Sequence, residues 1–229
     1  MFHLMYGFYQ WMFTRTTYNM IIVGLDGAGK TSLLEQSKTL FTDARGLPPD
    51  KIVPTVGLNI GRVVMSGVEL LIWDLGGQAT LRAIWPQYYS EAHAVIWVLD
   101  STDSDRFEEA REQLRGVLGS ELLAGKPVLL FVNKQDLATA RGPTELEEYF
   151  RAALASGIQG EHRAAEDEDD LESAAREDLA LLGGDGGGGP GRAGGGGAMS
   201  ERPWRVQGMS ALSGEGIGEG LGWLISVLV

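Results

Sequence analysis

The eight residues GLDGAGKT, Gly24–Thr31, lie between a short apolar run and a pattern of residues typical of a helix. They fit G-x-x-x-x-G-K-[ST], in which glycines allow backbone N–H groups to surround phosphates. Lys30 would supply charge to the β and γ oxygens, the Thr31 hydroxyl can ligate Mg²⁺, and the following helix adds the positive end of its dipole. The stretch therefore predicts a nucleotide-binding loop. Its expected contact residues are Gly24, Leu25, Asp26, Gly27, Ala28, Gly29, Lys30, Thr31 and Ser32.

Apolar runs and helical patterns alternate along the chain on both sides of this loop. Strands are expected at Tyr18–Val23, Leu58–Met65, Val68–Asp74, Ala94–Asp100, Val128–Asn133 and Arg205–Ser210. Helices are expected at Lys30–Phe41, Leu81–Tyr89, Ser104–Leu118, Thr144–Leu154 and Ile217–Leu228. Ser66-Gly67 between the second and third strands predicts a hairpin, whereas helices between the other strands indicate parallel crossovers. The predicted class is α/β, a six-stranded, mainly parallel sheet with one antiparallel strand and helices on both faces.

The length of 229 residues predicts one domain, and the net charge of −12 is unevenly distributed along it. Nine acidic residues against two arginines between 161 and 178 account for −7, which leaves −5 for the remainder. This balance argues against nucleic-acid binding, which needs clustered basic residues. The absence of cysteine excludes disulfides, thiolate metal sites and S-palmitoylation, and fits a cytosolic protein.

The segment at about 160–200 combines the acidic run with eleven glycines among residues 183–197. Such a composition buries too little apolar surface to offset the entropy of ordering, which predicts a disordered insertion before the last strand. A neutral expansion is favoured over the alternative, an acidic docking segment for a partner.

The N-terminal sequence MFHLMYGFYQWMF, residues 1–13, is apolar and aromatic but lacks the basic start and cleavage site of a signal peptide. Leu4, Phe8, Trp11 and Met12 would share one face of a helix. We expect an amphipathic membrane and switch helix over 1–17, with peripheral membrane contact through 1–13. No apolar run reaches the roughly 18–20 residues of a membrane-spanning helix.

A second motif, WDLGGQ, places Asp74 at the carboxyl end of an apolar strand, where open α/β sheets bind ligands. Asp74 can hold Mg²⁺ through water, Gly77 leaves room for a γ-phosphate, and Gln78 can orient a water for in-line attack. Taken alone, the motif is better explained as a strand-end aspartate followed by a glycine-rich turn. The expected catalytic residues are Gln78 and Lys30. In PTVG, Thr55 lies on a loop that could bring its hydroxyl to the metal and the γ-phosphate.

A third motif, NKQD, Asn133–Asp136, follows the end of another predicted strand. A carboxylate on Asp136 can accept hydrogen bonds from N1–H and the 2-amino group of guanine, donors that adenine lacks. Asn133 and Lys134 complete the expected base site, and Ser210-Ala211 after the last strand could turn backbone N–H groups toward the guanine carbonyl. Together with the phosphate loop and Asp74, the motif predicts a guanine nucleotide.

The motifs GLDGAGKT, PTVGLNI, WDLGGQ, NKQD and SAL together make the chain resemble a small GTPase of the Arf family over about 1–158 and 203–229. The MF start, LEQSK and TVGLNIG are similar to the Arf-related subfamily of the trans-Golgi. The resemblance implies a P-loop GTPase fold, a GTP/GDP cycle with Mg²⁺, and hydrolysis that is slow without an activating protein. It also implies a monomer that cycles from the cytoplasm onto Golgi membranes in vesicle and protein transport. The implied partners are an exchange factor, a GTPase-activating protein, Golgi effectors and a membrane-protein receptor.

The chain departs from the family pattern at two positions. Gly27 replaces the usual Asn of the phosphate loop, and Phe2 replaces the glycine that Arf proteins myristoylate. The subfamily resemblance implies instead an acetylated N-terminus that a Golgi membrane protein recognises. It further implies a hairpin that shifts register by two residues on GTP binding and evicts the N-terminal helix.

By the same resemblance Leu58, Trp73 and Tyr88 form the effector surface. Ordinary core packing is the alternative for each of these side chains, and for Leu58 the two interpretations are equally favoured.

Two other functions remain open from the sequence. A P-loop small-molecule kinase would need an acceptor pocket with a lid and basic residues, and NKQD does not belong to that class. A pseudo-GTPase scaffold would bind nucleotide without turnover, yet Lys30, Thr31, Thr55, Asp74 and Gln78 are all present. A GTP-binding switch is therefore preferred.

Overall fold

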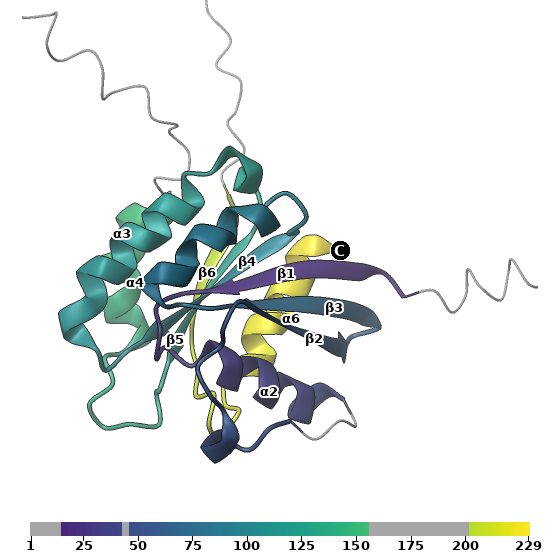
Figure 1. The fold of residues 1–229 in the computed structure, drawn as a ribbon, viewed down its shortest axis with the longest axis horizontal. Coiled ribbons are helices and arrows are strands. Elements are labelled where there is room, and N and C mark those ends of the chain that lie inside the picture. The colour runs from purple at the N-terminus through teal and green to yellow at the C-terminus, as the bar shows by residue number, and fades with distance from the viewer. Residues whose placement is uncertain (1–14, 43–45, 156–201) are drawn as a thin grey trace, which may run out of the picture.

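The computed structural model describes residues 15–42, 46–155 and 202–229, which form one sheet with flanking helices (Figure 1). The strands are β1 (Thr17–Val23), β2 (Leu58–Met65), β3 (Val68–Leu75), β4 (Ala94–Asp100), β5 (Val128–Asn133) and β6 (Trp204–Gly208). The α-helices are α2 (Lys30–Phe41), α3 (Phe107–Leu118), α4 (Pro143–Ala155) and α6 (Ile217–Leu228). Short 3₁₀ helices are η1 (Pro49–Lys51), η2 (Ala79–Tyr88), η3 (Ser104–Arg106) and η4 (Glu121–Leu123). Most of the predicted N-terminal helix and the predicted insertion lie outside the described residues, and β1 already begins at Thr17.

The six strands run in the order β2-β3-β1-β4-β5-β6. The β2–β3 pair is antiparallel and every other neighbouring pair is parallel, which confirms the predicted sheet. Between β2 and β3 the turn residues Ser66 and Gly67 have φ angles of 52° and 80°. Two consecutive left-handed residues are typical of the tight turn that matches strand twist, so the predicted hairpin is confirmed.

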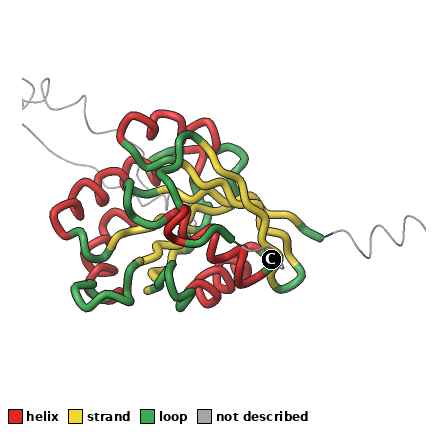
Figure 2. The backbone as a smooth tube through the Cα atoms, turned by 60° about the horizontal axis from the view of Figure 1, so that its bottom comes forward, coloured by secondary structure: helices red, strands yellow, loops and turns green. Residues whose placement is uncertain are grey.

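Helices cover both faces of the twisted sheet (Figures 1 and 2). Consecutive residues of β1 alternate between faces, as a pleated strand requires. Met20 and Ile22 pack into the cluster that contains α2 and α6, whereas Ile21 and Val23 pack with α3 and α4. Within the described part of the chain no helix is both long and apolar enough to cross a membrane.

Three predicted elements differ from the structure. Leu81–Tyr89 was expected as an ordinary helix, but Ala79–Tyr88 is a 3₁₀ helix with Pro86 inside it, where the missing N–H cannot support an α-helical ladder. The expected Ser104–Leu118 helix divides into η3 and α3. The last strand ends at Gly208 rather than Ser210, because the Ser210 hydroxyl accepts the N–H groups of Leu212 and Ser213 and turns the chain.

This topology brings the predicted motifs to one edge of the sheet. The carboxyl ends of parallel β1, β3, β4 and β5 carry the phosphate loop, Asp74, Asp100 and Asn133 in that order. Such an edge is where open α/β sheets bind ligands.

Candidate functional site

The phosphate loop is held against the sheet by glycines that leave no room for side chains. Gly24 and Gly29 have φ angles of 141° and 94°. A Cβ on Gly24 would lie 2.3 Å from the Val98 carbonyl oxygen, and one on Gly29 would lie 2.2 Å from Asn133 Nδ2. The loop therefore needs glycine at both positions, for conformation and for space.

Lys30 is folded back under this loop. Its Nζ donates to the carbonyl oxygens of Gly24 at 3.0 Å and Leu25 at 2.7 Å, and the side chain is buried. Burial is the main cause that lowers the pKa of Lys30 to about 8. A Cβ on Gly77 would lie 2.2 Å from the same Nζ, which places the WDLGGQ segment directly over the loop. Lys30 can therefore turn from carbonyl oxygens to the oxygens of a phosphate.

Three side-chain oxygens converge beside Lys30. Thr31 Oγ1 lies 2.7 Å from Thr55 Oγ1 and donates to Asp74 Oδ2 at 2.7 Å, while Thr55 Oγ1 lies 3.3 Å from the same carboxylate oxygen. Asp74 is fully buried, burial raises its pKa, and its Oδ1 has no hydrogen-bond partner. Hard oxygen ligands with a carboxylate are what Mg²⁺ binds together with waters and phosphates. The donor set and the unpartnered oxygen fit that ion.

A cavity of about 430 Å³ opens over these groups, a volume in the range of small-ligand sites. It joins the phosphate loop to Thr55 and to the Gly77-Gln78 pair. Gln78 is exposed and immediately precedes η2. Both predicted catalytic residues and two of the three predicted metal residues thus line one cavity, and the third, Asp74, bonds to Thr31 beside it.

The predicted base site is also assembled. Asn133 is buried, donates from Nδ2 to the Ala28 carbonyl at 2.7 Å, and accepts from the Ala211 N–H at 2.9 Å. Ser210 Oγ donates to Asp136 Oδ1 at 2.6 Å and so orients an otherwise exposed carboxylate. One asparagine therefore connects the phosphate loop, the end of β5 and the loop after β6.

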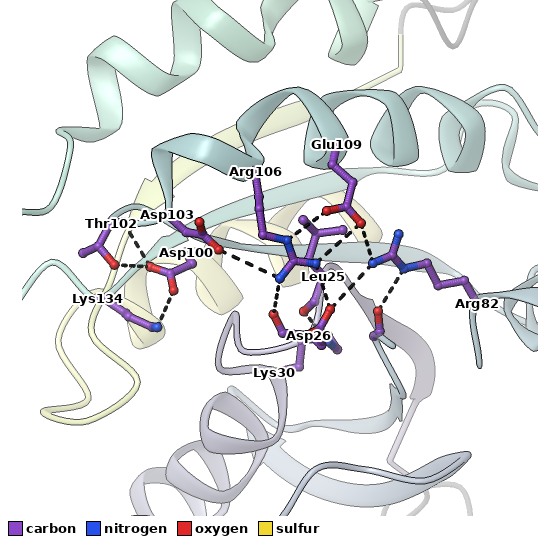
Figure 3. Close-up of polar contacts among 11 residues, drawn as sticks. Leu25, Asp26, Lys30, Arg82, Asp100, Thr102, Asp103, Arg106, Glu109 and Lys134 are labelled. Carbon is purple, nitrogen blue, oxygen red and sulfur yellow. Dashed lines mark hydrogen bonds and ion pairs between the residues drawn. The ribbon is translucent and has the colours of Figure 1, made fainter. Parts of the chain in front are cut away.

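Lys134 has a φ of 69°, and its ammonium group pairs with Asp100 at the end of β4 (Figure 3). Asp100 also accepts from the Thr102 N–H at 3.0 Å and hydroxyl at 2.7 Å. Burial opposes ionisation of Asp100, but these donors outweigh it and lower the pKa of the carboxyl. Sequence reasoning missed Asp100, although it ends an apolar strand and Asp74 lies one residue before the end of another. It also missed Arg82, Arg106 and Glu109, which lie beside Asp26 (Figure 3).

The three residues predicted as an effector surface lie at the base of the hairpin and on η2. Trp73 exposes only 8% of its surface and its ring centroid lies 5.7 Å from that of Tyr88. Leu58 and Tyr88 are half-buried and pack against the same core cluster. The structure brings these side chains together, and their role in effector binding stays a prediction.

Comparisons with known proteins point to one family. The model of the ADP-ribosylation factor family matches residues 5–161. ADP-ribosylation factor-related protein 1 of Homo sapiens is 46% identical over 151 residues, covering 66% of this chain and 75% of that protein. ADP-ribosylation factor-like protein 3 of Saccharomyces cerevisiae is 32% identical over 227 residues, covering 98% of this chain and 92% of that protein.

The fold is similar to that of the Arl6 small GTPase of Trypanosoma brucei, solved with the bound nucleotide analogue GppNp. The TM-score is 0.63 at 26% identity, and the match covers 93% of this chain and 98% of the other. Residues 5–161 include the phosphate loop, Asp74, Gln78 and the NKQD motif, so the family match spans most of the candidate site.

Proposed function

The chain belongs to the ADP-ribosylation factor family of small GTPases, and from this premise we propose that it is a GTP-operated switch that recruits effectors to Golgi membranes in vesicle and protein transport. The observation that carries the nucleotide part is Asn133. Its side chain bonds both the phosphate loop and the loop after β6, so the phosphate and base halves of the site share one support.

In the proposed complex, backbone N–H groups of the loop and Lys30 hold the phosphates. Thr31, Thr55 and, through water, Asp74 hold Mg²⁺, which would neutralise charge on the β and γ oxygens. Asp136 accepts the two guanine donors, with Lys134, Ser210 and Ala211 around the base. The hydrogen bond from Ser210 supports this role because it fixes the carboxylate of Asp136.

Gln78 orients the attacking water in the proposed reaction, and Gly77 leaves space for the terminal phosphate. An arginine supplied by a GTPase-activating protein stabilises such transition states by about 10³–10⁵-fold, so intrinsic hydrolysis should be slow. The proposed cycle also needs an exchange factor. Leu58, Trp73 and Tyr88 would form the effector surface at the junction of the hairpin and η2.

The membrane part of the proposal rests on the sequence of residues 1–13. We take the aromatic segment as the lipid-facing anchor, and a single weak anchor gives only marginal membrane binding. A membrane-protein receptor for the acetylated N-terminus would supply the remaining affinity. Phe2→Gly should disperse the protein from the Golgi with GTP binding intact, which fluorescence localisation beside a binding assay tests.

Nucleotide content and turnover test the central proposal and separate it from a scaffold without turnover. We expect purified protein to release one guanine nucleotide per chain on denaturation, with ATP failing to compete for the site. Single-turnover assays with an activating protein should show hydrolysis that Gln78→Leu abolishes. Binding without any stimulated hydrolysis would favour the scaffold, and equal competition by ATP would contradict a guanine site.

A further inference from the structure

A carboxylate lies inside the phosphate-binding loop, where a nucleotide would bring further negative charge. The Asp26 side chain is half exposed, and its Oδ1 accepts from Arg106 NH2 at 2.8 Å and lies 3.7 Å from Arg82 NH2. The hydrogen bond from Arg106 is the main cause that lowers the pKa of Asp26. The acid therefore stays ionised and is compensated by two arginines from outside the loop.

Glu109 on α3 connects these two arginines (Figure 3). Its Oε1 lies 2.8 Å from Arg82 NH2, and its Oε2 accepts from Arg106 Nε at 2.8 Å. Asp103 lies at the periphery, 3.9 Å from Arg106 NH1. A single glutamate thus fixes one arginine of η2 and one that precedes α3, and both face the phosphate loop.

Arg82 makes a further contact that Arg106 does not. Its Nε donates to the Gly77 carbonyl oxygen at 2.9 Å, and only 11% of its side chain is exposed. Gly77 and Gln78 line the cavity opposite Lys30. Trp85 Nε1 donates to the Gly76 carbonyl at 3.0 Å, so two consecutive glycine carbonyls are held by side chains of η2.

We propose that Arg82 is a positioning residue for the GTP form of the site. Held by Glu109 of α3 and by Asp26 of the phosphate loop, it fixes the Gly77 carbonyl and with it the Gly77–Gln78 peptide over the place of the terminal phosphate. The inference rests on the proposed GTP site. Because GDP has no terminal phosphate, loss of this support weakens retention of GTP and its hydrolysis more than retention of GDP.

Dissociation of fluorescent GDP and of a fluorescent non-hydrolysable GTP analogue from the full chain in Mg²⁺ tests the proposal. For Arg82→Gln and Glu109→Gln we expect the GTP analogue to be released about tenfold faster than from the wild type. This is the order expected for loss of a partly exposed charged hydrogen bond. Release of GDP should change by under about twofold. Glu108→Gln is the matched control. Glu108 is on the same turn of α3 but pairs with Arg111 and Tyr149, and its variant should match the wild type.

Two further variants separate positioning from general loosening. The double variant Arg82→Gln/Glu109→Gln should release the GTP analogue no faster than either single variant, because each acts through the other. Arg106→Gln should change release of GDP and of the GTP analogue alike, and each by under about twofold, since Arg106 contacts Asp26 and Glu109 but not Gly77. Thermal unfolding of each variant confirms that it is folded.

Equal acceleration of GDP and GTP release by Arg82→Gln, or additive effects in the double variant, would overturn the positioning role. Failure of the wild type to bind guanine nucleotide would instead refute the proposed function itself. Guanine binding by the wild type with no GTP-selective change in Glu109→Gln would remove the inference and leave the proposed function standing.

Discussion

The base end and the phosphate end of the candidate site are held together in different ways. At the base end, the buried amide of Asn133 bonds backbone groups of two other segments, at Ala28 and Ala211. At the phosphate end, Thr31, Thr55 and Asp74 bond one another, and Asp74 Oδ1 has no partner. A bound nucleotide would leave the bonds of Asn133 in place, whereas a metal ion and a phosphate would replace those among Thr31, Thr55 and Asp74.

This difference assigns separate tasks to the two ends. A base end fixed by the fold can select guanine in every state of the protein. A phosphate end whose side chains bond one another can respond to which phosphates are bound. Mutations could then change the selection of guanine without changing the response to the bound phosphates, and the reverse.

Asp136→Asn should give the largest effect and act on the base end alone. The amide offers a donor where guanine also donates, but it suits the 2-oxo group of xanthine. A site built to hydrogen-bond a group rejects the wrong partner by about 10⁴-fold or more, so preference should turn from GTP to XTP by that order. Competition binding of GTP, XTP and ATP measures it. An unchanged preference for GTP in this variant would show that Asp136 does not recognise the guanine base.

The base and phosphate motifs were predictable because the spacing of short motifs along alternating strands brings them to one sheet edge. Asp74 and Asn133 could each be predicted as site residues because they lie at or near the carboxyl end of a strand. The network of Arg82, Arg106 and Glu109 was not predictable, since its members lie far from Asp26 in sequence and meet only through the packing of η2 and α3. The 3₁₀ form of η2 does not follow from its helical pattern, because Pro86 lies inside it and removes a backbone N–H from the ladder.

Asp74→Ala should weaken Mg²⁺-dependent GTP binding at the phosphate end. The effect should be smaller than that of Asp136→Asn on base selection. A residue that holds a metal through water typically contributes about 10–100-fold in metal-dependent binding. We expect the variant to release GTP faster than the wild type by that factor in Mg²⁺. In EDTA the two release rates should be the same. Asp100→Asn is the matched variant, because Asp100 also ends a strand but pairs with Lys134 at the base end. If both variants showed the same dependence on Mg²⁺, the two ends would not be separate.

The affinity for GDP should depend on pH because Lys30, at the phosphate end, must carry a charge to bind the phosphates. Burial lowers the pKa of Lys30 to about 8, and bound phosphates favour the charged form and raise that pKa. Affinity is therefore highest below pH 8 and falls as pH rises through it, by about fourfold between about pH 7 and pH 8.5. Isothermal titration measures this fall. Lys30→Arg should bind with a flat profile, and a fall of equal size in that variant would assign the effect to another group.

The smallest effect is expected where the chain departs from its family, at Gly27. Its φ of 75° is a left-handed conformation that Asn tolerates better than other side chains, and a Cβ there would meet nothing within 4 Å. Gly27→Asn should also reduce the conformational freedom of the unfolded chain. This stabilises the folded state by roughly 0.4–1 kcal/mol and offsets the residual backbone strain at position 27. We expect GDP and GTP affinities within about twofold of the wild type and a nearly unchanged melting temperature.

The same substitution at Gly29 tests whether this tolerance is local. A Cβ on Gly29 would lie 2.2 Å from Asn133 Nδ2, the amide that joins the phosphate loop to the base end. Gly29→Asn should therefore weaken binding of both nucleotides and also of guanosine, which has no phosphate, whereas Gly27→Asn should leave guanosine binding unchanged. Loss of phosphate binding alone in Gly29→Asn would mean that the two ends are not joined through Asn133. A large loss in Gly27→Asn would show that this loop needs glycine for its freedom and not only for space.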